Sequence, residues 1–108
     1  MPLDWDALIL LLRWQFANRS YSVTDHADDR CAERSISIAD IENCIMTGAI
    51  LEEQAWGPDP KVLVKGDKED GGPFYIIVAI AKDKPWVVTV CSIDENVWEV
   101  VNGLIRRK

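Results

Sequence analysis

The segment of residues 74–93 reads FYIIVAIAKDKPWVVTVCSI, and its pattern sets the expected fold class of the chain. Its two apolar runs, Phe74–Ala81 and Trp86–Ile93, are rich in β-branched and aromatic residues, which is typical of strands buried on both faces. The polar residues Lys82–Pro85 between them have the length of a hairpin connection. We therefore predict two adjacent antiparallel strands at the centre of a sheet.

Shorter strand patterns precede this hairpin at Ile50–Glu53 and Lys61–Lys65, and Tyr21–Val23 is a further short strand. Helical patterns fill the first half of the chain, and a short helix capped by Asp94 is expected to close it. Helices followed by consecutive strands indicate the α+β class. The predicted fold is a set of N-terminal helices packed on one antiparallel sheet of four to five strands, with a short C-terminal helix.

The helix boundaries carry local signals. Asp4 and Thr24 are N-caps of the first and second helices, and Ser37 with Asp40 three residues later has the spacing of a capping box. Gly48 follows the third helical pattern, where a glycine in the left-handed conformation commonly ends a helix. These signals predict three helices before the first long strand.

The chain has 108 residues, of which 48% are hydrophobic and 28% charged, so it is neither disordered nor membrane-like. We expect one domain over residues 1–108: a helical extension (1–19), a core (20–98), and the end of the closing helix with a basic tail (99–108). The net charge of −6 argues against non-specific coating of nucleic acid. The apolar run Ala7–Leu12 is too short to span a bilayer, so no membrane association is expected.

The cysteines are odd in number and widely spaced, at Cys31, Cys44 and Cys91, and His26 is the only histidine. Structural zinc needs about four Cys or His ligands, so we expect no metal and no other cofactor. Unpaired thiols in small apolar positions fit a reducing compartment. This usage predicts a cytoplasmic protein.

The first helix is apolar around most of its circumference. Such a helix is either enclosed by its own chain or shared with a partner, and a domain of this size has little material to enclose it. We expect a homodimer or a contact with another protein through Leu8, Leu11, Leu12 and Trp14. Burial of all four residues inside the chain is the alternative.

The second helix holds the residues best suited to chemistry. His26, Arg30 and Arg34 follow one another at four-residue spacing, which places them along one helical face. Adjacent positive charges require an anion: either acidic groups of the same chain, such as Asp28 and Glu33, or a phosphate held by the guanidinium groups. The His26 imidazole is suited to act as a general base, and a hydrogen bond to the nearby backbone is the alternative.

Two lysines alternate along the strand pattern at Lys61–Lys65. We interpret the face that carries Lys61 and Lys65 as solvated. The alternative is that the two ammonium groups add positive charge to a binding surface on the sheet.

The stretches YSVTDHADDR (residues 21–30) and RSIS (residues 34–37) resemble the opening signature of the bacterial domain-of-unknown-function family 4258. The order further along the chain is similar as well: a helix ended by Gly48, the strand VLVKG at 62–66, and the apolar strands near 74–80 and 87–90. The resemblance extends from about Tyr21 to Trp98 and leaves the first helix outside.

This resemblance implies a fold similar to that of the RelE and BrnT toxins, metal-independent cleavage of RNA, and an antitoxin protein as partner. It implies a catalytic site of His26, Arg30 and Arg34, with Lys65 and Ser92 as substrate-binding residues on the sheet. Metal-free RNA cleavage needs a base for the 2′-hydroxyl and fixed positive donors for the charge that develops on the phosphate. We therefore expect a toxin-type ribonuclease, with a non-catalytic interaction or dimerisation module of the same fold as the alternative.

Overall fold

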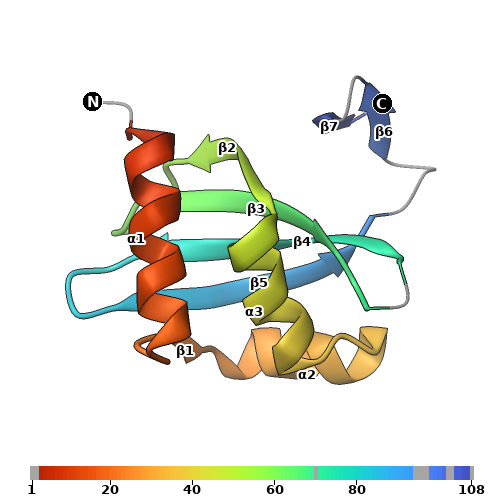
Figure 1. The fold of residues 1–108 in the computed structure, drawn as a ribbon, viewed down its shortest axis with the longest axis horizontal. Coiled ribbons are helices and arrows are strands. Elements are labelled where there is room, and N and C mark those ends of the chain that lie inside the picture. The colour runs from red at the N-terminus through yellow and green to blue at the C-terminus, as the bar shows by residue number, and fades with distance from the viewer. Residues whose placement is uncertain (1–2, 70, 94–97, 102–103, 108) are drawn as a thin grey trace.

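The computed structural model describes residues 3–69, 71–93, 98–101 and 104–107. Within these ranges, three helices lie against a five-stranded sheet, and two further strands form a separate two-stranded sheet (Figure 1). In chain order the elements are α1 (Trp5–Ala17), β1 (Ser22–Val23), α2 (Asp25–Arg34), α3 (Ile38–Thr47), β2 (Ala49–Gln54), β3 (Lys61–Asp67), β4 (Pro73–Ile80), β5 (Pro85–Ser92), β6 (Trp98–Val101) and β7 (Leu104–Arg107).

The predicted hairpin of β4 and β5 lies at the centre of the sheet, whose strand order is β1-β5-β4-β3-β2. The two strands are antiparallel, with Tyr75 opposite Cys91 and Ile76 opposite Val90. β3 pairs with the other side of β4, and β2 pairs with β3, both antiparallel. The α+β class and the predicted number of strands in the sheet are therefore confirmed.

One edge of the sheet differs from the prediction of a wholly antiparallel sheet. β1 pairs with β5 in parallel, with Ser22 opposite Trp86 and Val23 opposite Val87, so the sheet is mixed. A tight turn forces neighbouring strands to run antiparallel, but two helices and three strands separate β1 from β5 along the chain. No local signal therefore sets the direction of β1.

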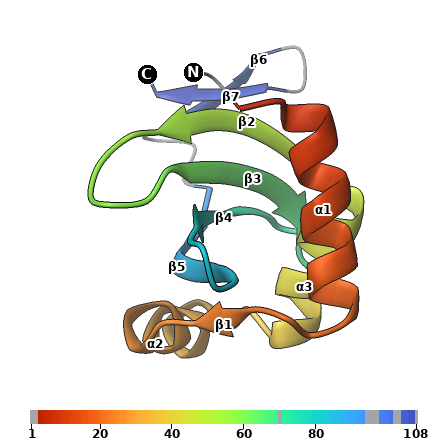
Figure 2. The same cartoon turned by 90° about the vertical axis from the view of Figure 1, so that its left-hand side faces the viewer.

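α1 and α3 cover one face of the sheet, and α2 lies along the edge formed by β1 and β5 (Figures 1 and 2). Alternate residues of the central strands point into the helix-covered face, because successive side chains of a strand alternate between faces. A smaller cluster around Leu63 and Ile77 lies on the opposite face. The main core contains, among others, Leu12, Phe16, Ile41, Ile45, Phe74, Ile76 and Val78.

The predicted N-caps are present at all three helices. The side chains of Asp4 and Thr24 accept backbone N–H groups from the first turns of α1 and α2. The capping box is reciprocal: Ser37 Oγ accepts the N–H of Asp40, and the Asp40 carboxylate accepts the N–H of Ser37, each at 3.0 Å. These starts are local in origin, which explains why the sequence alone predicts them.

The predicted left-handed stop at Gly48 is wrong. Gly48 is extended, with φ −84° and ψ −172°. Glycine is needed there for a different reason, because a Cβ atom would lie 2.3 Å from the carbonyl oxygens of both Cys44 and Lys65. The left-handed helix end occurs instead at Ser35, directly after α2, with φ 55° and ψ 43°.

The predicted C-terminal helix is also wrong. Residues 98–101 and 104–107 form the antiparallel strands β6 and β7, with Val101 opposite Leu104. The expected cap, Asp94, lies outside the described residues. The sequence WEVV of β6 favours a strand, and Asn102-Gly103 is the dipeptide most typical of a two-residue hairpin turn.

Lys61, expected on a solvated strand face, is only 4% exposed. Its Nζ donates hydrogen bonds to the backbone carbonyls of Trp56 at 2.6 Å and Asp59 at 2.9 Å, and it lies 4.0 Å from the centre of the Trp56 ring. The connection between β2 and β3 thus satisfies the buried ammonium group. Lys65 is half-buried, and its Nζ lies 4.0 Å from Oδ1 of Asp67.

The three cysteines form no disulfide bond. Cys31 and Cys44 are buried in the core, and burial raises the pKa of Cys44 to about 12. The thiol of Cys44 is therefore inert at neutral pH. None of the described helices combines the length and the apolar character that crossing a membrane requires.

Candidate functional site on helix α2

α2 is fixed to the sheet edge at its start and along one side. The backbone N–H of Thr24, the N-cap, donates to the carbonyl of Val87 in β5 at 3.0 Å. Ala27 and Cys31, one turn apart, are buried in the main core. The remaining circumference of α2 is therefore held in a defined orientation.

His26, Arg30 and Arg34 form a row beside this buried side, and we call these three residues the basic row. Because they follow one another at four-residue spacing, they lie on one face of the helix, as predicted. His26 is exposed, and both arginines are half-buried. The rise of 1.5 Å per residue separates neighbouring members by about 6 Å and the two ends by about 12 Å.

Arg30 is paired with a carboxylate of its own helix. Its Nη1 lies 2.9 Å from Oε2 of Glu33, and the two side chains are 37% and 59% exposed. The internal ion pair that the sequence allowed is thus present for this arginine. An exposed pair contributes at most about 1 kcal/mol, so Arg30 can exchange Glu33 for another anion at small cost.

Arg34 and His26 differ from Arg30. The Nε of Arg34 is buried and has no hydrogen-bond partner. Neither Arg34 nor His26 forms a salt bridge with the described residues. Buried N–H groups in proteins are nearly always hydrogen-bonded, so the guanidinium of Arg34 is unusual in its surroundings.

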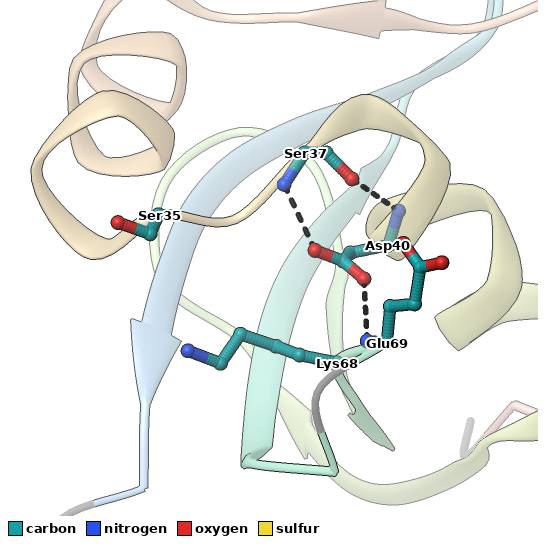
Figure 3. A pocket seen from close by; sticks show the side chains of 5 residues that line it. All are labelled: Ser35, Ser37, Asp40, Lys68 and Glu69. Carbon is teal, nitrogen blue, oxygen red and sulfur yellow. Dashed lines mark hydrogen bonds between the residues drawn. The ribbon is translucent and has the colours of Figure 1, made fainter.

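A cavity of about 400 Å³ lies where α2 passes into α3, and Ser35, the residue that follows Arg34, is among the polar residues that line it. Figure 3 shows the Ser37, Asp40 and Glu69 groups gathered on one side of it, with Ser35 and the amino group of Lys68 on the other. Sequence patterns had not indicated Lys68, because it lies in an acidic, glycine-rich connection between strands. Its place beside α2 depends on how that connection folds back onto α3.

Asp40 holds the cavity together. One carboxylate oxygen accepts the N–H of Ser37 at 3.0 Å and the other accepts the N–H of Glu69 at 2.8 Å. Burial alone raises the pKa of Asp40, but the hydrogen bonds from Ser37 and Glu69 and the positive charge of Lys68 outweigh it and lower the pKa below its usual value. Asp40 is thus an ionised cross-link and is unsuited to act as an acid.

The two residues expected on the sheet are not brought together. Lys65 pairs with Tyr75 and Ser92 pairs with Phe74, and directly paired residues share a face of the sheet. Phe74 belongs to the helix-covered core, whereas Tyr75 packs in the cluster on the opposite face. Lys65 and Ser92 therefore point to opposite faces of the sheet and do not both belong to one site.

Only half of the residues expected at a partner surface on α1 are exposed. Leu8 and Leu12 are buried in the core, at 9% and 1% exposure. Leu11 and Trp14 are 49% and 65% exposed, and Leu10, which the sequence pattern did not single out, is 64% exposed. An exposed apolar surface is thus present on α1, but it is built around Leu10, Leu11 and Trp14.

Among the described residues, no group of three or more His, Cys, Asp or Glu side chains is placed to hold a metal ion. No curated protein and no solved structure matches the chain. Residues 23–92 match the family described as "Domain of unknown function (DUF4258)", which confirms the family resemblance. The match begins at the second residue of β1 and runs to the end of β5, and it leaves α1, β6 and β7 outside. Since the matched segment is more than half of the sequence, the chain belongs to this domain-of-unknown-function family.

Proposed function

We propose that the protein is a toxin-type, metal-independent ribonuclease of the cytoplasm, with a fold akin to the RelE and BrnT toxins and an antitoxin protein as partner. The supporting observation is the guanidinium of Arg34, which has no carboxylate partner among the described residues and a buried Nε without a hydrogen bond. A phosphate oxygen is the natural acceptor for the Nη groups of this guanidinium, because guanidinium groups bind phosphates in bidentate geometry.

The chemistry assigns one role to each residue of the basic row. The imidazole of His26 removes the proton of a ribose 2′-hydroxyl, and the oxygen attacks the adjacent phosphorus. The bond from phosphorus to the 5′-oxygen breaks, and that oxygen takes a proton from water. Arg30 and Arg34 donate to the phosphate oxygens as negative charge develops on them. The products are a 2′,3′-cyclic phosphate and a 5′-hydroxyl end.

The spacing of the row suits a single strand that lies along α2. Arg30 lies about 6 Å and Arg34 about 12 Å from His26 along the helix, and both guanidinium groups turn toward the phosphate that is cleaved in this proposal. Arg30 must first release Glu33, which an exposed pair allows. In a chain of net charge −6, RNA binding depends on these local contacts to phosphate and weakens as salt rises.

The proposal is tested with a single-stranded RNA oligonucleotide and its fully 2′-deoxy counterpart, both with a chelator present. We expect cleavage of the RNA, with cyclic-phosphate ends, and none of the deoxy strand, because the attacking hydroxyl is missing. Cleavage of both strands, or cleavage that leaves 5′-phosphate ends, contradicts the proposed chemistry. An exposed lysine in the connection between β4 and β5 supplies the control variant, Lys82→Ala, which should cleave as the unaltered chain does.

A second candidate function is supported by α1: a non-catalytic module that binds another protein chain. Leu10, Leu11 and Trp14 are each about half or more exposed, on a helix outside the matched family segment. Exposed apolar side chains that gather on one face mark an interaction surface. This function predicts association that is unaffected by substitutions in the basic row.

A further inference from the structure

We infer that the exposed face of α1 pairs with the same face of a second copy of this chain, the two helices running antiparallel. The inference rests on the second candidate function and names its partner. Besides Trp5 and Asp6 at its start, the exposed positions of α1 are Ala7, Leu10, Leu11, Trp14 and Ala17. Positions 7, 10, 14 and 17 follow the three-four-three spacing by which two helices pack side by side.

The order of side-chain sizes along this face is self-complementary. In antiparallel pairing with the two-fold axis at the level of position 12, Leu10 lies against the partner's Trp14, and Trp14 against the partner's Leu10. Ala7 then lies against the partner's Ala17. The two large pairs lie at the centre while the small pairs let the helix ends approach, so the order of sizes is complementary to that of a second copy.

The charges at the two ends of the helix support the same direction. Asp6 is exposed at the start of α1, and Arg19 is exposed just after its end. Neither forms a salt bridge with the described residues. Antiparallel pairing brings Asp6 near the partner's Arg19 at both ends of the contact, whereas parallel pairing brings like charges together.

The remaining charged residue of the helix does not interfere. Arg13 is turned toward the body of the protein: its Nε donates to the carbonyl of Ile45 at 3.1 Å, and its Nη2 donates to that of Gly48 at 3.3 Å. The centre of the exposed face is therefore apolar, and the charges stand only at its rim. This is the arrangement expected of a protein interface.

The test is the self-association of the full chain, measured by sedimentation equilibrium over a wide range of concentrations. We expect dimers, and a dissociation constant raised at least about 30-fold by Leu10→Glu or by Trp14→Glu, since both side chains lie at the centre of the contact. The matched control is Ile38→Glu: Ile38 is an equally apolar side chain on α3, 45% exposed. It should leave the constant unchanged.

The antiparallel direction is tested by charge reversal. Asp6→Arg and Arg19→Asp should each weaken the dimer, and the double variant should restore it to within about threefold, because the attraction is rebuilt across the two-fold axis. The inference is overturned if the chain stays monomeric at every concentration, or if Leu10→Glu leaves the dimer intact. It is also overturned if the double variant dimerises more weakly than both single variants. RNA cleavage is measured on the same Leu10→Glu protein, so failure here is distinct from failure of the ribonuclease proposal.

Discussion

The carboxylate of Asp40 accepts the backbone N–H of Glu69 at 2.8 Å, so a single buried side chain joins the start of α3 to the connection between β3 and β4. Its second oxygen closes the capping box with the N–H of Ser37. The cavity beside the basic row is shaped by these two bonds (Figure 3). The shape of the cavity and the stability of the fold therefore depend on the same two hydrogen bonds.

We predict that Asp40→Ala lowers the free energy of unfolding by about 1–3 kcal/mol, because it removes one half of the capping box and leaves two backbone N–H groups without acceptors. Urea denaturation at neutral pH measures the change. Glu69→Ala is the matched control, since only the backbone of Glu69 takes part in the bond. If both variants lose the same stability, the cross-link does not have the role assigned to it.

The low pKa of Asp40 leads to a prediction about acid. Its value in the fold lies below that of the unfolded chain, about 3.9, so the ionised carboxylate stabilises the protein fully above that pH. This contribution is lost as the pH falls through the folded-state pKa. The difference in unfolding free energy between the unaltered chain and Asp40→Asn should be constant from about pH 7 to about pH 5 and shrink below about pH 4. A difference that stays constant in acid contradicts the ionised cross-link.

Replacing Ser35 with glycine should stabilise the folded protein. It adopts φ 55° at the end of α2, where a side chain strains the backbone and glycine does not. We expect Ser35→Gly to raise the free energy of unfolding by about 0.5–1 kcal/mol. The control is Ala32→Gly, at an exposed position inside α2, which should lower it by a similar amount. Thermal denaturation of the two variants must therefore move the midpoint in opposite directions.

Glu33 should compete with RNA for Arg30. Removing its charge frees the guanidinium, so Glu33→Gln is expected to tighten the binding of single-stranded RNA by about two- to fivefold, the equivalent of an exposed ion pair. Fluorescence anisotropy with labelled RNA at fixed salt measures the affinity. Glu52→Gln makes the same charge change on β2, at the far edge of the sheet, and should have no such effect. If both variants bind RNA more tightly by the same factor, the effect comes from the change in net charge and not from competition for Arg30.

Much of the fold was predictable because its signals are local. The caps at Thr24 and Ser37 and the hairpin of β4 and β5 depend on residues close in sequence. Asn102-Gly103 is an equally local hairpin signal, and the helix predicted after Asp94 does not take it into account. The parallel direction of β1 had no local signal at all.

The candidate site was predictable only in part. Four-residue spacing was enough to place His26, Arg30 and Arg34 on one face, but both arginines had acidic neighbours in the sequence. Only the structure shows that Arg30 takes Glu33 while Arg34 takes none of the described carboxylates. The burial of Lys61 and the position of Lys68 depend on how connections fold back, which spacing along a strand does not encode.

The central claim is that Arg34 serves RNA chemistry and not the stability of the fold. The most direct measurement is the rate of RNA cleavage by Arg34→Ala together with its thermal midpoint, beside the unaltered chain and Lys82→Ala. We predict a rate lowered by about 10²–10³ with a nearly unchanged midpoint, since one preorganised charge donor is lost and no ion pair is broken. A folded Arg34→Ala protein that cleaves RNA at the full rate would contradict the claim.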